Sequence, residues 1–278
     1  MLPSGVRRVP GLSLALAMLL VGVHVNTAAR QAGSEPRLEA ALGAFAAVRR
    51  AHPEARVGGT LLSEAPPTVR SAVADLVRTD GMVAERGDGE LDGATDELMQ
   101  AALHMPQYQD GYRAGRPSLR TAVLSPICHR HVGSLIANLL GLLLLGALLE
   151  WRAGPTAVVV VFVLGAAGGL AAHHVADPSS LVPLLGASGA VSALLGALAG
   201  GATGRWRGPL WGVTGLVVVL SVSAAALGLA PGISHTAHMG GLAVGLLFSR
   251  FRPTRGGASG QCTRDSAVLP AAGDRGPG

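Results

Sequence analysis

The chain has 278 residues, of which 49% are hydrophobic and only 14% carry a charged side chain. A soluble domain carries about 25% charged residues, and here the charged residues are nearly absent from residues 131–249. The apolar second half therefore excludes a soluble enzyme and indicates a protein embedded in lipid. The basic residues, all of them arginine, lie in small groups beside apolar runs. This arrangement is typical of membrane topology, so no nucleic-acid partner is expected.

Apolar runs long enough to cross a membrane recur along the chain. A spanning helix needs about 20 apolar residues, and runs without arginine or lysine cover residues 9–29, 131–149, 153–176 and 178–204. The run over residues 208–249 is too long for one crossing, and Pro231 and Gly232 predict a turn inside it. The sequence therefore predicts an all-α polytopic membrane protein with six transmembrane helices.

The positions of the arginines predict the topology. Arginines precede the first run, separate the second run from the third and the fourth from the fifth, and follow the last. The loops over residues 174–183 and 229–234 contain none. Short loops rich in arginine stay in the cytoplasm, so both termini are expected there. The exclusive use of arginine resembles the coding bias of a high-GC genome, and the expected location is a bacterial inner membrane.

The predicted organisation has four parts. Residues 1–29 form an N-terminal transmembrane helix, for which a cleaved signal peptide is the alternative because Arg7 and Arg8 precede a short apolar core. Residues 30–123 form an extracytoplasmic segment between helices 1 and 2, with helical spacing over residues 37–50 and a second helix over 68–78. Residues 124–250 form the membrane core, and residues 251–278 a disordered cytoplasmic tail.

Three polar stretches interrupt the apolar second half, where polar residues are costly and usually functional. The first contains Gly186, Ser188 and Gly189, at the start of the fourth run. A serine between glycines is also typical of close helix packing, and the spacing Gly196–Gly200 favours such packing. On this stretch alone, packing is the better interpretation.

The second stretch leads into the last run and contains His235 and His238. His235 fits a solvated histidine at the membrane surface, whereas His238 lies deeper and is followed by Gly241 and Gly245, which would let this helix approach the fourth. A serine on one helix and a histidine on its neighbour are the minimum for nucleophilic catalysis, because serine needs an adjacent base.

The third stretch enters the second run. At helical spacing His131, Ser134 and Asn138 share one face. The side-chain amide of Asn138 could donate a hydrogen bond to an oxyanion or could simply bond a neighbouring helix.

In this order, and on successive even-numbered spans, the three stretches resemble the rhomboid proteases, and the resemblance covers residues 110–250. It implies that Ser188 is the nucleophile and His238 the general base of a dyad without an acid. Asn138 and the backbone N–H of Ser188 would stabilise the oxyanion. Gly186 and Gly189 would position substrate, and His235 and His131 would line the cavity. Ser134 stands where the family usually has a histidine that contributes to the oxyanion site.

The expected function is therefore that of an intramembrane serine endopeptidase, which cleaves transmembrane or juxtamembrane segments of membrane proteins. The replacement by Ser134 keeps open a weak or inactive relative that binds such segments without cutting them. A transporter using the histidines as a proton path would need charged partners within the spans, and the sequence offers none there apart from Glu150 at a helix end, which argues against a transporter. No metal or cofactor is expected, because the histidines lack a ligand set with carboxylates or thiolates.

Overall fold

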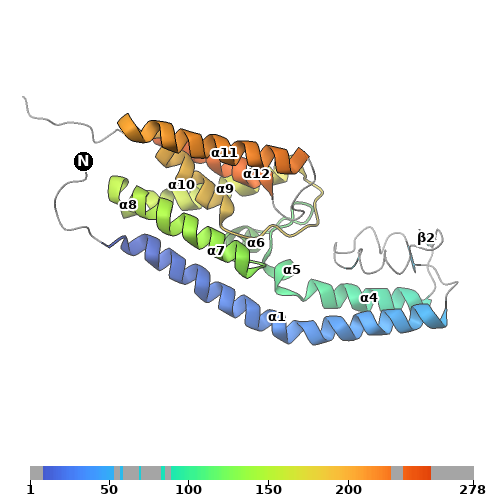
Figure 1. The fold of residues 1–278 in the computed structure, drawn as a ribbon. Helices are drawn as coiled ribbons and strands as arrows, with labels where there is room; N and C mark the ends of the chain where they lie inside the picture. The colour runs from blue at the N-terminus through green and yellow to red at the C-terminus, as the bar shows by residue number, and fades with distance from the viewer. Residues whose placement is uncertain are drawn as a thin grey trace, which may run out of the picture.

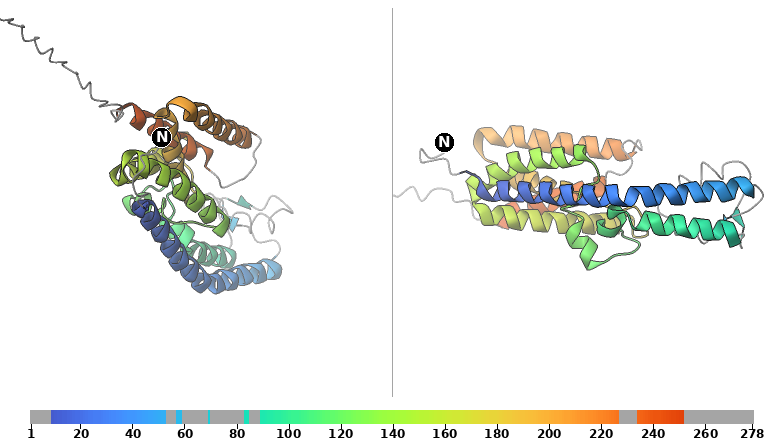
Figure 2. Two further views of the ribbon diagram at one scale, coloured as in Figure 1. Left: turned by 60° about the vertical axis from the view of Figure 1, so that its left-hand side comes forward. Right: turned by 90° about the horizontal axis from the view of Figure 1, so that it is seen from below.

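The computed structural model describes residues 9–52, 57–58, 69, 83–84, 89–226 and 234–251. These residues form a bundle of helices from which a long helical hairpin extends at one end (Figure 1). Within the bundle the first helix runs beside the others, and in the hairpin it continues beyond them (Figure 2).

The first helix, α1, covers Gly11–Ala51, 41 residues in all. It passes through residue 29 without a break, so the predicted span and the predicted helix over residues 37–50 are parts of one element. Pro36 lies inside α1; a proline removes one backbone hydrogen bond and bends a helix. The ribbon of α1 is bent along its length (Figure 1).

The hairpin is completed by α4, Gly89–Leu103, which packs along the second part of α1. Phe45 of α1 and Leu98 of α4 are fully buried between the two helices. Two short strands, β1 (Val57–Gly58) and β2 (Val83–Ala84), pair in parallel. Apart from single residues, the helix predicted over residues 68–78 and the predicted C-terminal tail lie outside the described part of the chain.

Two short helices connect the hairpin to the bundle: α5, Pro106–Asp110, and α6, Leu119–Leu124. Ser118 caps α6 by accepting a hydrogen bond from the backbone N–H of Thr121. Arg30 of α1 and Arg120 of α6 both pair with the buried carboxylate of Asp110. This ion cluster ties the hairpin to the bundle.

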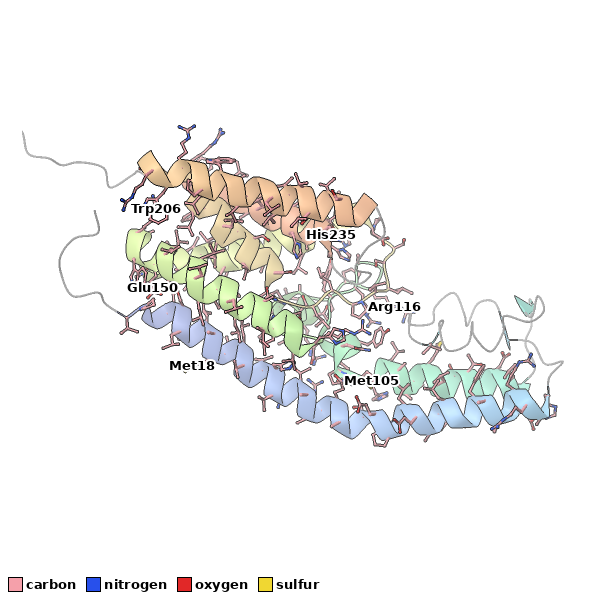
Figure 3. All side chains as sticks on the ribbon, in the orientation of Figure 1. Met18, Met105, Arg116, Glu150, Trp206 and His235 are labelled. Carbon is pink, nitrogen blue, oxygen red and sulfur yellow. The ribbon has the colours of Figure 1, made fainter. Side chains whose placement is uncertain are left out.

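The second predicted span is one helical column of three segments: α7 (Val132–Gly141), a π-helical segment (Leu142–Gly146) and α8 (Ala147–Ala153). Glu150 lies near its end and accepts hydrogen bonds from the backbone N–H groups of Leu12 and Ser13 (3.1 and 2.9 Å). These are donors that the start of a helix cannot satisfy internally. Glu150 therefore fixes the start of α1 at one end of the bundle, while His235 marks the other end (Figure 3).

The centre of the bundle is formed by α9 (Pro155–Ala176), α10 (Ser188–Gly200) and α12 (His235–Phe251), with α10 and α12 in the most extensive contact. A side-chain carbon at Gly241 would collide with the backbone carbonyl of Gly189, and one at Gly245 with that of Ala193. The small residues of α12 thus bring its backbone against that of α10, as their spacing predicts.

The run over residues 178–204 contains a shorter helix than predicted. Its helical part is α10, which has 13 residues and spans about 20 Å at 1.5 Å per residue. Pro178, Pro183 and Gly186 lie in the loop before it, where proline and glycine disfavour a helix. Hydropathy alone does not separate such a loop from a helix. A 3₁₀ turn (Gly204–Trp206) and α11 (Arg207–Ala226) follow.

Three described helices are long and apolar enough to cross a membrane: Gly11–Ala51, Val132–Ala153 and Pro155–Ala176. Large apolar side chains are exposed on the bundle surface, among them Met18, Leu140 and Val163. An exposed apolar surface of this kind is stable when lipid covers it. The fold is that of a helical integral membrane protein, and the number of six crossings stays a prediction.

Candidate active site

Ser188 is the first residue of α10, and the segment that leads to it is held by backbone hydrogen bonds. Leu184 exchanges two of them with Tyr112 (3.0 and 2.8 Å), and the N–H of Gly186 donates to the carbonyl of Ser125 (2.8 Å). These hydrogen bonds to the segment between α5 and α7 therefore hold the loop before Ser188 in place.

Gly186 has a φ of 116°, a conformation that residues with a side-chain carbon rarely adopt. A carbon added there would lie 3.6 Å from Nδ2 of Asn138 and 3.9 Å from Nε2 of His129. These are ordinary contact distances, so the backbone angle rather than the available space favours glycine. The positive φ turns the chain into the start of α10.

His129 joins Asn138 to the loop before Ser188. Its side chain is buried, at 1% exposure. Its Nε2 lies 3.0 Å from Nδ2 of Asn138 and 3.4 Å from the backbone nitrogen of Ala187. Both neighbours are donors, so Nε2 is the acceptor and the ring carries its proton on Nδ1. One unprotonated ring nitrogen thus receives a hydrogen bond from α7 and another from the loop.

Burial also affects the ionisation of this ring. It lowers the pKa of His129 from 6.5 to about 4, because a charged imidazolium is poorly solvated there. At neutral pH His129 is therefore uncharged and keeps its acceptor nitrogen.

Asn138 is buried, and its amide donates a second hydrogen bond to the carbonyl of Ser134 (2.9 Å). His131 and Ser134 lie before it and are exposed. The hydroxyl of Ser134 donates to the carbonyl of His131 (3.1 Å). The three residues do not share one environment, and the histidine that contacts Asn138 is His129.

His238 lies in the first turn of α12, which Ser234 caps by accepting from the N–H of Ala237 (3.2 Å). The rings of His235 and His238 meet edge to face, with centroids 6.2 Å apart. Because α12 packs on α10, His238 and Ser188 are carried by adjacent helices at the same end of the bundle. In the described structure no hydrogen bond joins their side chains.

A small cavity of about 20 Å³ lies beside Ser188, lined among others by Ser125, Gly189 and Ala237. This volume matches a single water molecule. A peptide does not fit, so substrate access requires the site to open.

Three further polar contacts at this end of the bundle were not assigned from the sequence. Ser234 lies 3.1 Å from Nδ1 of His173, and the hydroxyl of Tyr112 lies 3.0 Å from Nδ1 of His174. The third is the contact of His129 with Asn138. His129 lies nine residues before Asn138 and outside α7, so helical spacing could not predict this contact. The paired histidines at the end of α9 were the available signal for the first two.

Among the described residues, no three or more histidine, cysteine, aspartate or glutamate side chains are placed to hold a metal ion. The polar atoms at the start of α10 belong instead to a serine, histidines, an amide and backbone N–H groups. Such groups carry nucleophilic and hydrogen-bonding chemistry.

The fold and this group of side chains define a helical integral membrane protein with polar groups inside its bundle. Residues 116–253 match the Rhomboid domain, and the chain belongs to the rhomboid family. It is also similar to the RHOMBOID-like protein 12, mitochondrial, of Arabidopsis thaliana. The two are 32% identical over 103 residues, which cover 31% of this chain and 30% of the relative. The chain thus spans under a third of that relative.

Proposed function

We propose that this protein is an intramembrane serine endopeptidase in which Ser188 is the nucleophile and His238 the general base. The observation that supports this most directly is the position of Ser188. It is the first residue of α10, beside a cavity the size of one water, with the helix that carries His238 packed against it. Membership of the rhomboid family supports the same reaction.

In the first step Ser188 Oγ attacks the scissile carbonyl carbon, and His238 accepts the hydroxyl proton. The negative oxygen of the tetrahedral intermediate is stabilised by the backbone N–H of Ser188 and by the amide of Asn138, which exchanges one of its two present hydrogen bonds, to His129 or to Ser134, for a bond to this oxygen. The first N–H groups of a helix lack partners within it, and the start of a helix favours negative charge. Collapse of the intermediate breaks the C–N bond, and His238 returns the proton to the leaving amine.

In the second step water attacks the acyl ester of Ser188, with His238 again accepting the proton, and hydrolysis restores the serine hydroxyl. The cavity beside Ser188 can supply this water. The substrates are transmembrane or juxtamembrane segments of membrane proteins, and a substrate helix must unwind locally to present its scissile bond to Ser188.

His129 has a positioning role in this proposal. Its Nε2 holds Nδ2 of Asn138 and the N–H of Ala187 on one side of Ser188. Asn138 is thereby held in place before substrate arrives, so one of its N–H groups can turn to the oxyanion without a large movement of the side chain, and donors placed in advance stabilise an oxyanion most effectively.

A second candidate is a non-catalytic protein that binds transmembrane segments. Two observations favour it: no hydrogen bond joins Ser188 to His238 in the described structure, and the hydroxyl of Ser134 is bonded to its own helix. Catalytic hydrogen bonds are often long without substrate and tighten on binding, so the first of these observations does not decide between the candidates.

The deciding experiment uses purified full-length protein in detergent with a generic single-span substrate and a fluorophosphonate probe. We expect cleavage and labelling by the wild type, loss of both in Ser188→Ala, and loss of cleavage in His238→Ala. Ser192→Ala, one turn further along α10, is the matched control and is expected to cleave normally. Absence of both cleavage and labelling in the wild type would establish the non-catalytic candidate.

A further inference from the structure

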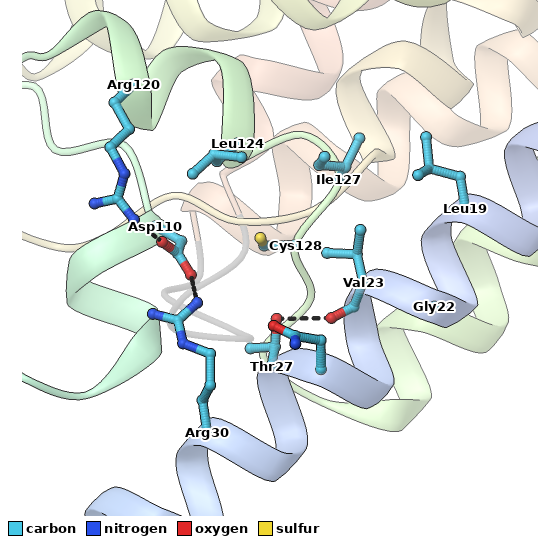
Figure 4. A pocket seen from close by; sticks show the side chains of 11 residues that line it. Leu19, Gly22, Val23, Thr27, Arg30, Asp110, Arg120, Leu124, Ile127 and Cys128 are labelled. Carbon is cyan, nitrogen blue, oxygen red and sulfur yellow. Dashed lines mark hydrogen bonds and ion pairs between the residues drawn. The ribbon is translucent and has the colours of Figure 1, made fainter.

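A larger cavity, of about 390 Å³, is lined by α1 and by the segment that carries Cys128 (Figure 4). One of its walls is a single face of α1, where Leu19, Val23, Thr27 and Arg30 follow each other at helical spacing. The cavity opens on the surface of the bundle and is separate from the cavity beside Ser188.

The polar end of this cavity carries a net positive charge. Asp110 lies between Arg30 and Arg120 (Figure 4), and its carboxylate oxygens accept from Arg30 (2.5 Å) and Arg120 (2.8 Å). The Asp110 side chain is 3% exposed, whereas those of Arg30 and Arg120 are 37% and 62% exposed. An anion in the cavity therefore meets guanidinium N–H groups and not the carboxylate.

The other end of the cavity is apolar. Leu19 and Val23 of α1 face Leu124 and Ile127 across it. Eleven residues separate Leu19 from Arg30, a rise of about 16 Å along the helix. Over this length the wall changes from aliphatic side chains through a hydroxyl to a cation. A phospholipid has the same order of groups, from acyl chain through glycerol ester to phosphate.

We propose that this cavity binds an anionic phospholipid. Its phosphate lies against Arg30 and Arg120, and the upper part of one acyl chain lies along Leu19 and Val23. The position fits, because the apolar run of α1 ends just before Arg30, which places the two arginines at headgroup level. A transmembrane segment is too large, since a helix about 10 Å wide fills this volume within one turn.

This site is independent of the proposed proteolytic function, and its test uses binding alone. The full-length protein is reconstituted in bilayers of phosphatidylcholine with a minor fraction of spin-labelled phosphatidylglycerol, and the bound fraction is measured against spin-labelled phosphatidylcholine. We expect phosphatidylglycerol to be retained in preference. Arg120→Gln should weaken its binding about five-fold, the effect of one arginine near an anionic surface.

A second variant leaves every charge in place. Gly22 lines the cavity, and a side-chain carbon there would meet no atom within 4 Å. Gly22→Leu should therefore fold normally, fill the apolar end and reduce phosphatidylglycerol binding. Arg37→Gln removes a cation from the exposed part of α1 and is the control, with binding expected unchanged.

Four results would overturn the proposal. The first two are equal retention of phosphatidylglycerol and phosphatidylcholine by the wild type, and equal losses in Arg120→Gln and Arg37→Gln. The third is displacement of the lipid by inorganic phosphate at the concentration at which a short-chain phosphatidylglycerol displaces it, because the apolar wall would then contribute nothing. The fourth, unchanged binding in Gly22→Leu, would have the same meaning.

Discussion

At the scale of single residues, His129 has the most consequential contacts in the candidate site. Its unprotonated Nε2 is the shared acceptor for the amide of Asn138 and the N–H of Ala187. Removing the acceptor leaves two buried donors unpaired, which costs about 1–3 kcal/mol for each. The same ring therefore affects both the stability of the fold and the position of the proposed oxyanion donors.

The first prediction concerns the rate of cleavage. His129→Ala should lower kcat by up to about 100-fold, the effect of displacing a catalytic group by about 1 Å, with KM nearly unchanged. His129→Gln keeps an acceptor oxygen at this position and should restore most of the rate. The measurement is steady-state cleavage of a single-span substrate, with His104→Gln, at the residue that follows α4, as the control. A wild-type kcat in His129→Ala would show that His129 does not position the donors.

The second prediction concerns pH and stability. The folded-state pKa of His129 is lowered from 6.5 to about 4, so between these values the unfolded chain binds a proton here that the folded chain does not. The free energy of unfolding therefore falls as pH drops from about 6.5 to 4 and levels off below. The total loss of unfolding free energy from His129 is about 3 kcal/mol, because each pKa unit corresponds to about 1.36 kcal/mol.

This loss is measured as the difference between the wild type and His129→Gln in denaturant unfolding across that range of pH. The curves should diverge below pH 6.5, with the variant showing less dependence on pH. Parallel curves would mean that His129 is accessible to protons in the folded state.

The roles of individual residues could be predicted from the sequence only where helical spacing or the family resemblance applied. Asn138 was identified by its place in a membrane helix; it is buried, and its role stays a prediction. His129 precedes α7, so helical spacing does not link it to Asn138. Its contact with Asn138 depends instead on the path of the chain before the helix. His131 is at the right spacing but lies at the exposed start of α7.

At the scale of helices, the bundle depends on residues without side chains. The backbone of α12 approaches α10 closely enough for Gly241 to contact the carbonyl of Gly189. Close backbone approach through small residues is a main source of helix association in lipid, where burial of apolar surface contributes little. This contact also sets the distance between the helices that carry Ser188 and His238.

The third prediction tests this contact. Gly241→Ala places a carbon against the carbonyl of Gly189 and should destabilise the protein by about 1–3 kcal/mol, the usual cost of overpacking. Gly215→Ala on α11 is the control, because a carbon there meets no atom within 4 Å. Alanine in a helix is otherwise favourable by about 0.5–1 kcal/mol over glycine. Measured by thermal unfolding in detergent, the Tm of Gly241→Ala should be lower than that of the wild type, whereas the Tm of Gly215→Ala should not be lowered. Equal Tm values for the two variants would contradict the close approach.

Most of the helices could be predicted from apolar runs, because a run of suitable length and a helix coincide where lipid surrounds the element. The prediction was poorest over residues 178–204, which contain a loop before α10. There the backbone groups of Leu184 and Gly186 bond to Tyr112 and Ser125 instead of continuing a helix. A hydropathy profile contains no information on such partners.

At the scale of the whole molecule, the arrangement of the hairpin and the bundle makes the predicted topology testable. The hairpin of α1 and α4 lies beyond one end of the bundle, and Trp206, which stands between two arginines at the start of α11, lies at the other (Figures 1 and 3). The rule for positive charges places the arginine-rich loops in the cytoplasm, and therefore places α4 outside.

The fourth prediction uses this separation. In a background of Cys128→Ala and Cys262→Ala, Gly93→Cys on α4 and Gly208→Cys on α11 both provide exposed thiols. A membrane-impermeant maleimide should label Gly93→Cys in intact spheroplasts, and Gly208→Cys only after permeabilisation. Labelling of both residues from the same side would show that the predicted orientation or number of crossings is wrong.

The length of α1 has a mechanical consequence. From Arg30 to its end at Ala51 the helix rises about 32 Å, and it is continuous with the part that packs in the bundle. A tilt of ~10° within the bilayer would swing the far end sideways by ~6 Å over that distance. A sideways force on the hairpin would therefore be transmitted along α1 to its contacts in the bundle, the ion pair of Arg30 with Asp110 and the contact of His24 with the His129 carbonyl before α7.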